Sequence, residues 1–160
     1  MLDKTLAIIK PDLVVSGKSG TVIELIELNK FNISKLSKLQ LTTEQAQEFY
    51  AIHKDKPFFG ELVEYMTSGP VVVMVLEKEN AVQEWRDLIG ATNPAKAAVG
   101  TLRKMFGQSM GINGFHGSDA LETAKEYIKE GTEVVIKHFP MGKKNRIEKA
   151  KEAYDFIEEK

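Results

Sequence analysis

Cysteine is absent from this sequence, which excludes disulfide bonds, zinc–thiolate sites, iron–sulfur clusters and a thiol nucleophile. Long hydrophobic runs are absent as well. The longest, Val71–Leu76, is far too short to cross a bilayer, and Leu6–Ile9 is too short for the apolar core of a secretory signal. Neither sign of charge dominates, since 22 Lys and Arg residues stand against 23 Asp and Glu residues, so binding to nucleic acid through bulk positive charge is not expected. These absences predict a cytoplasmic protein with no membrane or nucleic-acid partner.

The chain is long enough and apolar enough for one folded domain. It has 160 residues, of which 42% are hydrophobic, and a single domain usually takes about 100–200 residues. No stretch rich in proline, glycine or serine divides it. Residues 141–160 are strongly charged and carry apolar residues at helical spacing from Ile147 to Ile157. We therefore predict one domain over residues 1–140 and an amphipathic C-terminal helical extension over residues 141–160.

Strands and helices are predicted to alternate along the chain. Four short apolar runs rich in β-branched residues indicate strands. These runs are Thr5–Ile9, Ile33–Leu41, Val71–Leu76 and Thr132–Ile136. Helical spacing indicates helices between them, with N-terminal capping pairs that begin at Thr21, Thr42 and Asp119. The segment Ala91–Gly117 has no clear period and is expected to be a long loop, which is often functional. This order favours an α/β sandwich of the split βαβ type over an all-parallel wound sheet.

One short motif imitates a P-loop, the glycine-rich turn that binds nucleotide phosphates. The segment Ser16–Ser19 reads Ser-Gly-Lys-Ser and lies between a predicted strand and a predicted helix. A P-loop also needs a glycine separated by four residues from the Gly-Lys pair, and that position here is Asp12. Because a carboxylate opposes phosphate there, the motif favours a polar turn before a helix. A P-loop nucleotide hydrolase, in which Lys18 would be the functional residue, is kept as an alternative.

A histidine between two glycines is the stronger candidate for chemistry. His116 lies between Gly114 and Gly117, directly before the helix that is predicted to begin at Asp119. Glycines permit a tight turn and leave the imidazole accessible. The start of the helix supplies N–H donors and a positive dipole, which suit a bound anion and favour the neutral imidazole that can act as a nucleophile. Taken alone, a loop histidine is more often a surface or capping residue.

The neighbourhood of this histidine is suited to a polyanion. Arg86, Thr92, Arg103 and Asn113 lie in or beside the same predicted loop, and no carboxylate occurs between Gly90 and Ser118. Guanidinium groups pair with phosphate oxygens and stabilise the charge that spreads over a phosphoryl group during transfer. Either arginine by itself would be interpreted as a solvated surface charge. Together with the histidine, these residues indicate a site for a phosphate chain.

The segment Asn-x-x-His-Gly-Ser-Asp around this histidine resembles the active-site signature of the nucleoside diphosphate kinases. Five motifs of that family occur in order from about residue 4 to residue 138. They are Thr5–Asp12, Lys54–Phe59, Ser68–Val72, Gly90–Pro94 and Asn113–Asp119. Five ordered motifs are far more specific than one short pattern. The resemblance implies a ferredoxin-like sandwich of the α/β (α+β) class, in which helices cover a four-stranded antiparallel sheet, with a long active-site loop and a C-terminal helix.

The resemblance also implies roles for residues of this chain. His116 would be the nucleophile that becomes phosphorylated through its Nδ1, and Ser118 would help to hold the ring. Phe58 would stack on the nucleotide base, and Met110 would face the base from the other side. The phosphate, ribose and catalytic positions of the family correspond to Lys10, Tyr50, Arg86, Thr92, Arg103 and Asn113. From spacing alone, the aromatic residues Tyr50 and Phe58 would be core residues, and their place inside the matched motifs reverses that interpretation.

The resemblance also implies the mechanism of the family, which makes physical sense of these residue types. A γ-phosphoryl group would pass from ATP or another nucleoside triphosphate to His116 and then to a second diphosphate, with ping-pong kinetics. Stacking on Phe58, worth about 1–3 kcal/mol, is available to every base, so broad base tolerance is implied. Mg²⁺ is the expected cofactor and would bridge phosphate oxygens, with no metal ligand predicted from the protein. The family forms tetramers or hexamers, so a homo-oligomer is expected, with the tail from Lys143 as a candidate contact.

The chain departs from the family at one position close to the chemistry. The family has a glutamate eleven residues after the histidine, hydrogen-bonded to the imidazole, and this chain has Tyr127 there. Glu126 is adjacent but turned by about 100° around a helix. A phenol offers a hydrogen bond without the charge of a carboxylate, and loss of an orienting partner would slow transfer by about 10²–10⁴. This departure keeps open an alternative, a catalytically weak nucleotide-binding or protein-interaction module of the same fold.

Overall fold

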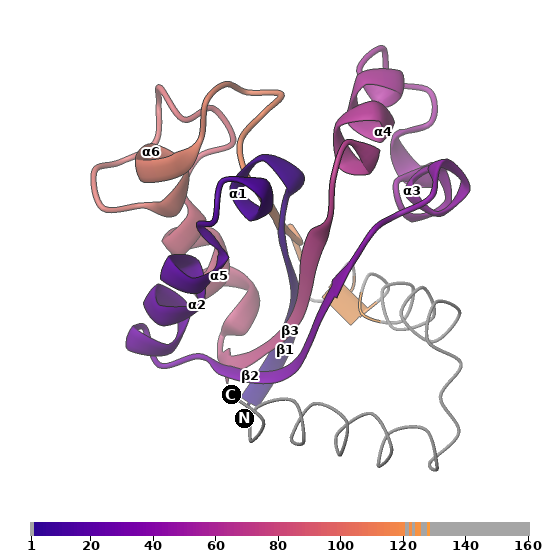
Figure 1. The fold of residues 1–160 in the computed structure, drawn as a ribbon. Coiled ribbons are helices and arrows are strands. Elements are labelled where there is room, and N and C mark those ends of the chain that lie inside the picture. Colours follow the sequence, from indigo (N-terminus) through magenta and orange to yellow (C-terminus); the bar gives the residue numbers. More distant parts are fainter. Residues whose placement is uncertain (1, 121, 123, 126–127, 129–160) are drawn as a thin grey trace, which may run out of the picture.

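The computed structural model of the chain describes residues 2–120, 122, 124, 125 and 128. Within them lies a four-stranded sheet in the order β2-β3-β1-β4, in which all neighbouring strands run antiparallel (Figure 1). The strands are β1 (Leu2–Ile9), β2 (Asn32–Leu39), β3 (Val71–Glu79) and β4 (Phe115–Gly117). Helices cover the sheet, so the predicted ferredoxin-like α/β fold is confirmed.

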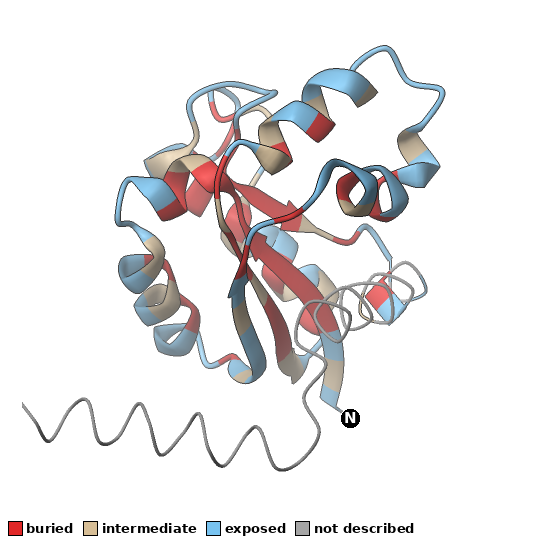
Figure 2. Ribbon diagram, turned by 45° about the vertical axis from the view of Figure 1, so that its right-hand side comes forward, coloured by how far each residue is buried: buried red, intermediate tan, exposed pale blue. Residues whose placement is uncertain are grey.

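The two central strands, β1 and β3, supply most of the core. They pair with each other along their whole lengths. Residues Thr5–Ile9 are all buried, and so are most of Val71–Leu76. Because successive side chains of a strand point to opposite faces, Ile8 and Ile9 belong to two different hydrophobic clusters, one on each side of the sheet. In Figure 2 the strands at the centre are largely buried, while the outer sides of the helices are exposed.

Helices α2 (Ser19–Leu28) and α5 (Ala81–Ile89) cover one face of the sheet (Figure 1). Each helix buries residues three or four positions apart, as amphipathic helices do. These buried residues include Val22, Ile26, Trp85 and Ile89. Helix α5 ends at Gly90, whose φ of +80° is a conformation that glycine adopts without strain.

Helices α3 (Thr43–Phe49) and α4 (Phe59–Thr67) cover the other face, with the 3₁₀ turn η1 (Ala51–His53) between them (Figure 1). Thr42 and Gln45 form a reciprocal capping box at the start of α3, as the sequence predicted. The two helices and Tyr50, which directly follows α3, bury five side chains against the sheet. These are Ala46, Phe49, Tyr50, Val63 and Met66.

Two short helices, α1 (Pro11–Val15) and α6 (Leu102–Phe106), lie near the end of the sheet at which β1 finishes (Figure 1). Pro11 opens α1 directly after β1, since proline fits the first position of a helix. The Thr101 hydroxyl caps α6 by accepting a hydrogen bond from the Lys104 backbone N–H. The residues that would have to wrap phosphates in a P-loop therefore form α1, and Lys18 is exposed.

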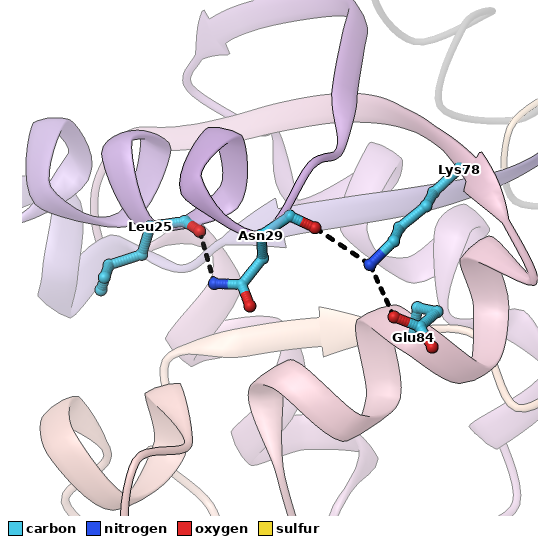
Figure 3. Close-up of polar contacts among 4 residues, drawn as sticks. All are labelled: Leu25, Asn29, Lys78 and Glu84. Carbon is cyan, nitrogen blue, oxygen red and sulfur yellow. Dashed lines mark hydrogen bonds and ion pairs between the residues drawn. The ribbon is translucent and has the colours of Figure 1, made fainter.

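A lysine joins three elements at the opposite end of the sheet (Figure 3). Lys78 on β3 donates through Nζ to the Asn29 backbone carbonyl at 3.0 Å and to Glu84 Oε2 on α5 at 2.6 Å. The same ammonium lies 4.9 Å from the centre of the Phe31 ring. Asn29 follows α2 and donates its side-chain N–H to the Leu25 carbonyl at 2.8 Å. This network fastens α2, β3 and α5 to one another.

The predicted strands at Thr5–Ile9, Ile33–Leu41 and Val71–Leu76 are confirmed, although each observed strand has somewhat different ends. The predicted cap at Thr21 is wrong, because α2 begins two residues earlier, at Ser19, without a side-chain cap. The expected long loop Ala91–Gly117 contains both α6 and β4, which are too short to create a sequence period. The predicted strand Thr132–Ile136 and the extension over residues 141–160 lie outside the described residues. Among the residues that are described, no helix is long and apolar enough to span a membrane.

Candidate active site

His116 lies on strand β4, and its pairing decides which way its side chain points. His116 is opposite Ile8 of β1, and Phe115 is opposite Ile9. Paired residues of neighbouring strands share a face, so His116 faces the side of the sheet that α3 covers, and Phe115 is buried on the other side. The indole N–H of Trp85 on α5 donates to the His116 carbonyl at 2.9 Å. The expectation of a loop histidine is therefore corrected, since β4 is an edge strand among the described residues.

The imidazole of His116 is only 8% exposed and is surrounded by rings and cations. The centres of the Phe49 and Tyr50 rings are 5.5 and 6.0 Å from its own. Burial, followed by the positive charges of Lys10 and Arg103, lowers the pKa of His116 to about 3. The ring is therefore neutral at neutral pH, as the sequence analysis expected, although burial and neighbouring cations are the causes rather than a helix dipole.

Lys10 lies where β1 ends, and its side chain is held by the segment that leads into β4. Its backbone N–H donates to the Gly114 carbonyl at 2.9 Å, and its Nζ donates to Asn113 Oδ1 at 3.0 Å. Burial and the charge of Arg103 lower the pKa of Lys10 to about 7, while the carboxylate of Asp12 opposes this shift. Lys10 has no ion-pair partner within the described part of the chain. Burial of an unpaired charge is costly, which points to a ligand that supplies negative charge.

Arg103 on α6 is held by two backbone carbonyls. Its Nη1 donates to the Gly90 carbonyl at 3.0 Å, and its Nη2 donates to the Phe115 carbonyl at 2.8 Å. Burial and the charge of Arg86 lower the pKa of Arg103 to about 10, so the guanidinium keeps its charge at neutral pH. Its Nε is buried and has no hydrogen-bond partner within the described residues. The arginine is thus fixed one residue away from His116 with a donor to spare.

A cavity of about 560 Å³ opens between α5 and the segment that follows it. Arg86, Thr92, Lys96 and Arg103 line it together with Gly117, the residue that follows the candidate nucleophile. With Thr101 and Asp87 also in the lining, three cations and two hydroxyls outweigh one carboxylate, and such donors suit a chain of phosphates. The structure therefore brings Arg86, Thr92 and Arg103 together, as the sequence pattern indicated.

The two residues expected to enclose a base lie at the surface on different elements. Phe58 is 47% exposed at the N-terminus of α4, and Met110 is 64% exposed in the segment after α6. The Phe58 ring centre is 5.7 Å from that of His53, which stacks on Tyr50 at 6.3 Å. A line of aromatic rings thus leads from Phe58 to His116. The Met110 carbonyl accepts a hydrogen bond from the Asn113 amide at 3.1 Å, which ties that segment to the phosphate side.

Ser118 is buried beyond His116, and its Oγ has no hydrogen bond within the described part of the chain. Residues 122, 124, 125 and 128 are helical, and the Ala124 N–H donates to the Ala120 carbonyl. A helix therefore follows the histidine, as predicted from Asp119. Tyr127, which replaces the glutamate of the family, lies outside the described residues.

Three residues at the site were missed by the sequence analysis. Trp85 holds the His116 carbonyl, Asp12 and Tyr65 share a hydrogen bond, and the Lys10 ammonium lies 5.6 Å from the centre of the Tyr65 ring. The signals available were weak, because Trp85 is the only tryptophan of the chain and Asp12 belongs to the first matched motif. Nothing in the sequence distinguishes Tyr65 from other tyrosines on amphipathic helices.

The donor set of the site fits a metal ion that arrives with phosphates better than one bound by the protein. No group of three or more His, Asp or Glu side chains suited to a metal occurs within the described residues. Lys10, Arg86 and Arg103 instead offer positive charge. An Mg²⁺ ion on a nucleotide keeps several waters and binds mainly to phosphate oxygens, so these residues would hold such an ion only through the phosphates.

Comparison with known proteins shows what this chain resembles along most of its length. The family model for nucleoside diphosphate kinase matches residues 3–131. The nucleoside diphosphate kinase of Campylobacter fetus is 54% identical over 127 residues, which is 79% of this chain and 93% of the relative. That of Bradyrhizobium diazoefficiens is 52% identical over 137 residues, which is 84% of this chain and 98% of the relative.

Solved structures agree with the sequence comparison. The Aquifex aeolicus nucleoside diphosphate kinase superposes with a TM-score of 0.79 at 40% identity, over 81% of this chain and 94% of that one. The enzyme from Halobacterium salinarum, solved in complex with CDP, gives a TM-score of 0.78 at 36% identity, over 81% and 87%. Sequence and fold thus agree, and the chain belongs to the nucleoside diphosphate kinase family of enzymes, which transfer phosphoryl groups between nucleotides.

Proposed function

We propose that this chain transfers the γ-phosphoryl group of a nucleoside triphosphate to a nucleoside diphosphate by a ping-pong mechanism, through a phosphohistidine at His116. The observation that carries the proposal is a buried, neutral imidazole beside the cations Lys10 and Arg103. A neutral ring has a lone pair with which to attack phosphorus, and the fixed cations stabilise the charge of the transferring group. Membership of the nucleoside diphosphate kinase family supports the reaction class.

In the first half-reaction, a lone pair of the His116 imidazole attacks the γ-phosphorus. A nitrogen–phosphorus bond forms at Nδ1 and the bond from the β,γ-bridging oxygen to phosphorus breaks, so the nucleoside diphosphate leaves with that electron pair. In the second half-reaction a terminal β-phosphate oxygen of another diphosphate attacks the phosphohistidine, and the imidazole leaves as a neutral ring. Because one histidine serves both halves, the first product departs before the second substrate binds.

The remaining site residues would bind and orient the nucleotide. Phe58 is exposed at the N-terminus of α4 and would stack on the base, with Met110 on the opposite side. Arg86 and Thr92 line the cavity beside Arg103 and would hold phosphates. Stacking does not select among bases, so broad use of ATP and other nucleotides is expected, and CDP bound to the Halobacterium relative supports this.

The smaller roles follow from what each side chain contacts. Asn113 would align Lys10 through the 3.0 Å hydrogen bond between them. Tyr50, packed against the His116 ring, would help to fix its plane and reach the nucleotide. Ser118, whose Oγ is buried two positions after His116 in the chain, would supply a hydrogen bond to the same ring. Mg²⁺ bound to the phosphates would neutralise part of their charge. We place this activity in the cytoplasm.

Incubation with ATP labelled in its γ-phosphate, without an acceptor, tests the proposal. We expect an acid-labile label on His116 that moves to GDP when GDP is added. The variant His116→Gln should take no label and lose turnover by at least about 10³, since the nucleophile is gone. Lys18→Ala is the matched control and should label like the wild type, because Lys18 is exposed. Free phosphate without a labelled histidine would instead favour a hydrolase, and binding without label would favour a weakly catalytic module.

The position of Tyr127 provides a further arm of the same experiment. A carboxylate there would restore the family's partner for the imidazole, so Tyr127→Glu should label His116 faster than the wild type, by about tenfold or more. Tyr127→Gln offers a hydrogen bond without charge and serves as the control. Equal labelling rates in all three proteins would show that this position does not limit the transfer.

A further inference from the structure

Close to Lys10 lies a carboxylate paired with a tyrosine. We propose that Asp12 and Tyr65 form a positioning pair for the reaction, in which the Asp12 carboxylate, fixed by the Tyr65 hydroxyl, holds the Lys10 ammonium at the phosphate-binding position. The inference rests on the proposed function, because that function gives Lys10 a phosphate to bind. Neither residue is expected to touch the nucleotide.

The contacts come from three elements that meet at this point. The Tyr65 hydroxyl on α4 donates a hydrogen bond to Asp12 Oδ1 on α1. The Nζ of Lys10, at the end of β1, lies 5.6 Å from the centre of the Tyr65 ring. A backbone hydrogen bond from Gly114 also acts on the Tyr65 hydroxyl. Tyr65 therefore contacts the Asp12 carboxylate, the Lys10 ammonium and Gly114, the residue that follows Asn113.

The presence of the Asp12 carboxylate beside a proposed phosphate site needs an explanation, because a carboxylate repels phosphate. Its Oδ2 is buried and accepts no hydrogen bond within the described residues, and no salt bridge there includes it. A buried carboxylate oxygen without a donor is costly. Its charge acts on Lys10, where it favours the protonated ammonium. That effect opposes part of the effect of burial, which remains the larger of the two and leaves the pKa of Lys10 at about 7.

The charge on Lys10 depends on every ionisable group that faces it. Arg103 on α6 disfavours its protonation, Asp12 on α1 favours it, and Lys10 in turn lowers the pKa of His116 on β4. Tyr65 remains a neutral phenol, since burial and the bond to Asp12 raise its pKa above the usual range. Among the groups that shift the pKa of Lys10, Asp12 is therefore the one that favours its charged form.

Removal of the Asp12 charge should change the pKa of Lys10, while removal of the Tyr65 hydroxyl alone should not. In Asp12→Asn the Lys10 pKa of about 7 should fall by about one unit, so the basic limb of the kcat/KM profile should move to lower pH by the same amount. The kcat/KM profile is the relevant one because it reports the free enzyme. In Tyr65→Phe, which keeps the ring and the carboxylate, we expect an unmoved limb and a fall in kcat of about threefold to tenfold.

A readout that does not depend on catalysis separates this inference from the proposed function. The ¹³Cε resonance of Lys10, assigned with a Lys10→Arg variant, should titrate near neutral pH in the wild type and about one unit lower in Asp12→Asn. Asp12→Glu keeps the charge and should titrate with the wild-type midpoint. It is also the variant to measure if Asp12→Asn does not fold. If Asp12→Asn left both the Lys10 titration midpoint and the basic limb of the kcat/KM profile unchanged, the proposed positioning pair would be overturned. A lower melting temperature of the variant would not alter that conclusion. Retained turnover in His116→Gln would overturn the proposed function while leaving the Lys10 titration intact.

Discussion

Burial is the main reason why the His116 imidazole stays neutral. An exposed histidine has a pKa near 6.5, and at His116 burial and the charges of Lys10 and Arg103 lower it to about 3. The same cations that would bind phosphates thus keep the nucleophile unprotonated. Asp119 acts in the opposite direction, but its contribution is the smallest of those that shift this pKa.

This pKa makes stability depend on pH with a definite sign. Below pH 6.5 the unfolded chain takes up a proton at His116 that the folded chain does not bind. The contribution of His116 to stability is therefore present above pH 6.5 and is lost as the pH falls toward about 3. Between pH 6.5 and 5 we expect a loss of about 1.5 kcal/mol in the free energy of unfolding.

Urea unfolding at a series of pH values measures this loss, and His116→Gln supplies the control. Glutamine does not titrate, so the wild type should lose about 1.5 kcal/mol more than the variant between pH 6.5 and 5. Parallel curves for the two proteins would show that the histidine is not buried as a neutral ring.

Helix α4 connects two parts of the site with different expected roles, the side that would bind the base and the side that would bind the phosphates. Phe58, which would stack on the base, stands at its N-terminus, and Tyr65, which contacts Asp12, lies in its last turns. Residues i and i+7 fall on nearly the same side of a helix. One rigid element thus fixes the distance between the base side and the phosphate side, which explains why the sequence needs an uninterrupted helix here.

The Lys78 network (Figure 3) holds helices at the end of the sheet away from the site. Lys78→Met keeps the length of the side chain but removes the two hydrogen bonds and the contact with the Phe31 ring. We expect a loss of about 1–2 kcal/mol in the free energy of unfolding, with kcat unchanged. Chemical unfolding together with a steady-state assay measures both.

Lys4→Met is the matched control for that variant. Lys4 forms an ion pair with Glu77 at 2.9 Å, but its side chain is 58% exposed. An exposed pair of this kind contributes little, so this variant should remain within about 0.5 kcal/mol of the wild type. Equal losses of unfolding free energy in the two variants would show that the network around Lys78 stabilises the fold no more than an ordinary surface ion pair does.

Among the residues that the structure describes, the sheet leaves β2 as an outer strand with one unpaired edge. Its side chains are mostly exposed, with Leu36 at 47%. Native proteins usually cover or protect such an edge, and the homo-oligomer expected for this chain would do so. The two lysines of the strand, Lys35 and Lys38, are exposed and make it a poor site for unspecific aggregation.

Sedimentation of the purified protein tests assembly directly. A tetramer or hexamer predicts a single species with four or six times the 17.9 kDa mass of one chain, stable on dilution to micromolar concentration. The predicted helix over residues 141–160 lies outside the described residues, so a second sample that lacks these residues asks whether they contribute. A stable monomer of the full chain would remove the prediction of an oligomer.

The sequence by itself determined the family and most of the elements. Local signals were sufficient where they were long or chemically specific. The continuous apolar run Val71–Leu76 predicted a strand, and the pair that begins at Thr42 predicted the cap of a helix. Five ordered motifs predicted the fold and the reaction class, because so many spaced matches do not arise by chance.

Only the tertiary structure decided how the site is assembled. Strand β4 has three residues and no sequence period of its own, and it becomes a strand because it pairs with β1. The hydrogen bond between Asp12 and Tyr65 joins residues 53 positions apart, and no local pattern encodes such a contact. The charge states of Lys10 and His116 likewise depend on burial and on neighbours from several elements. Sequence fixes residue types and local propensities, whereas burial and long-range distances, which set pKa values, exist only once the chain has folded.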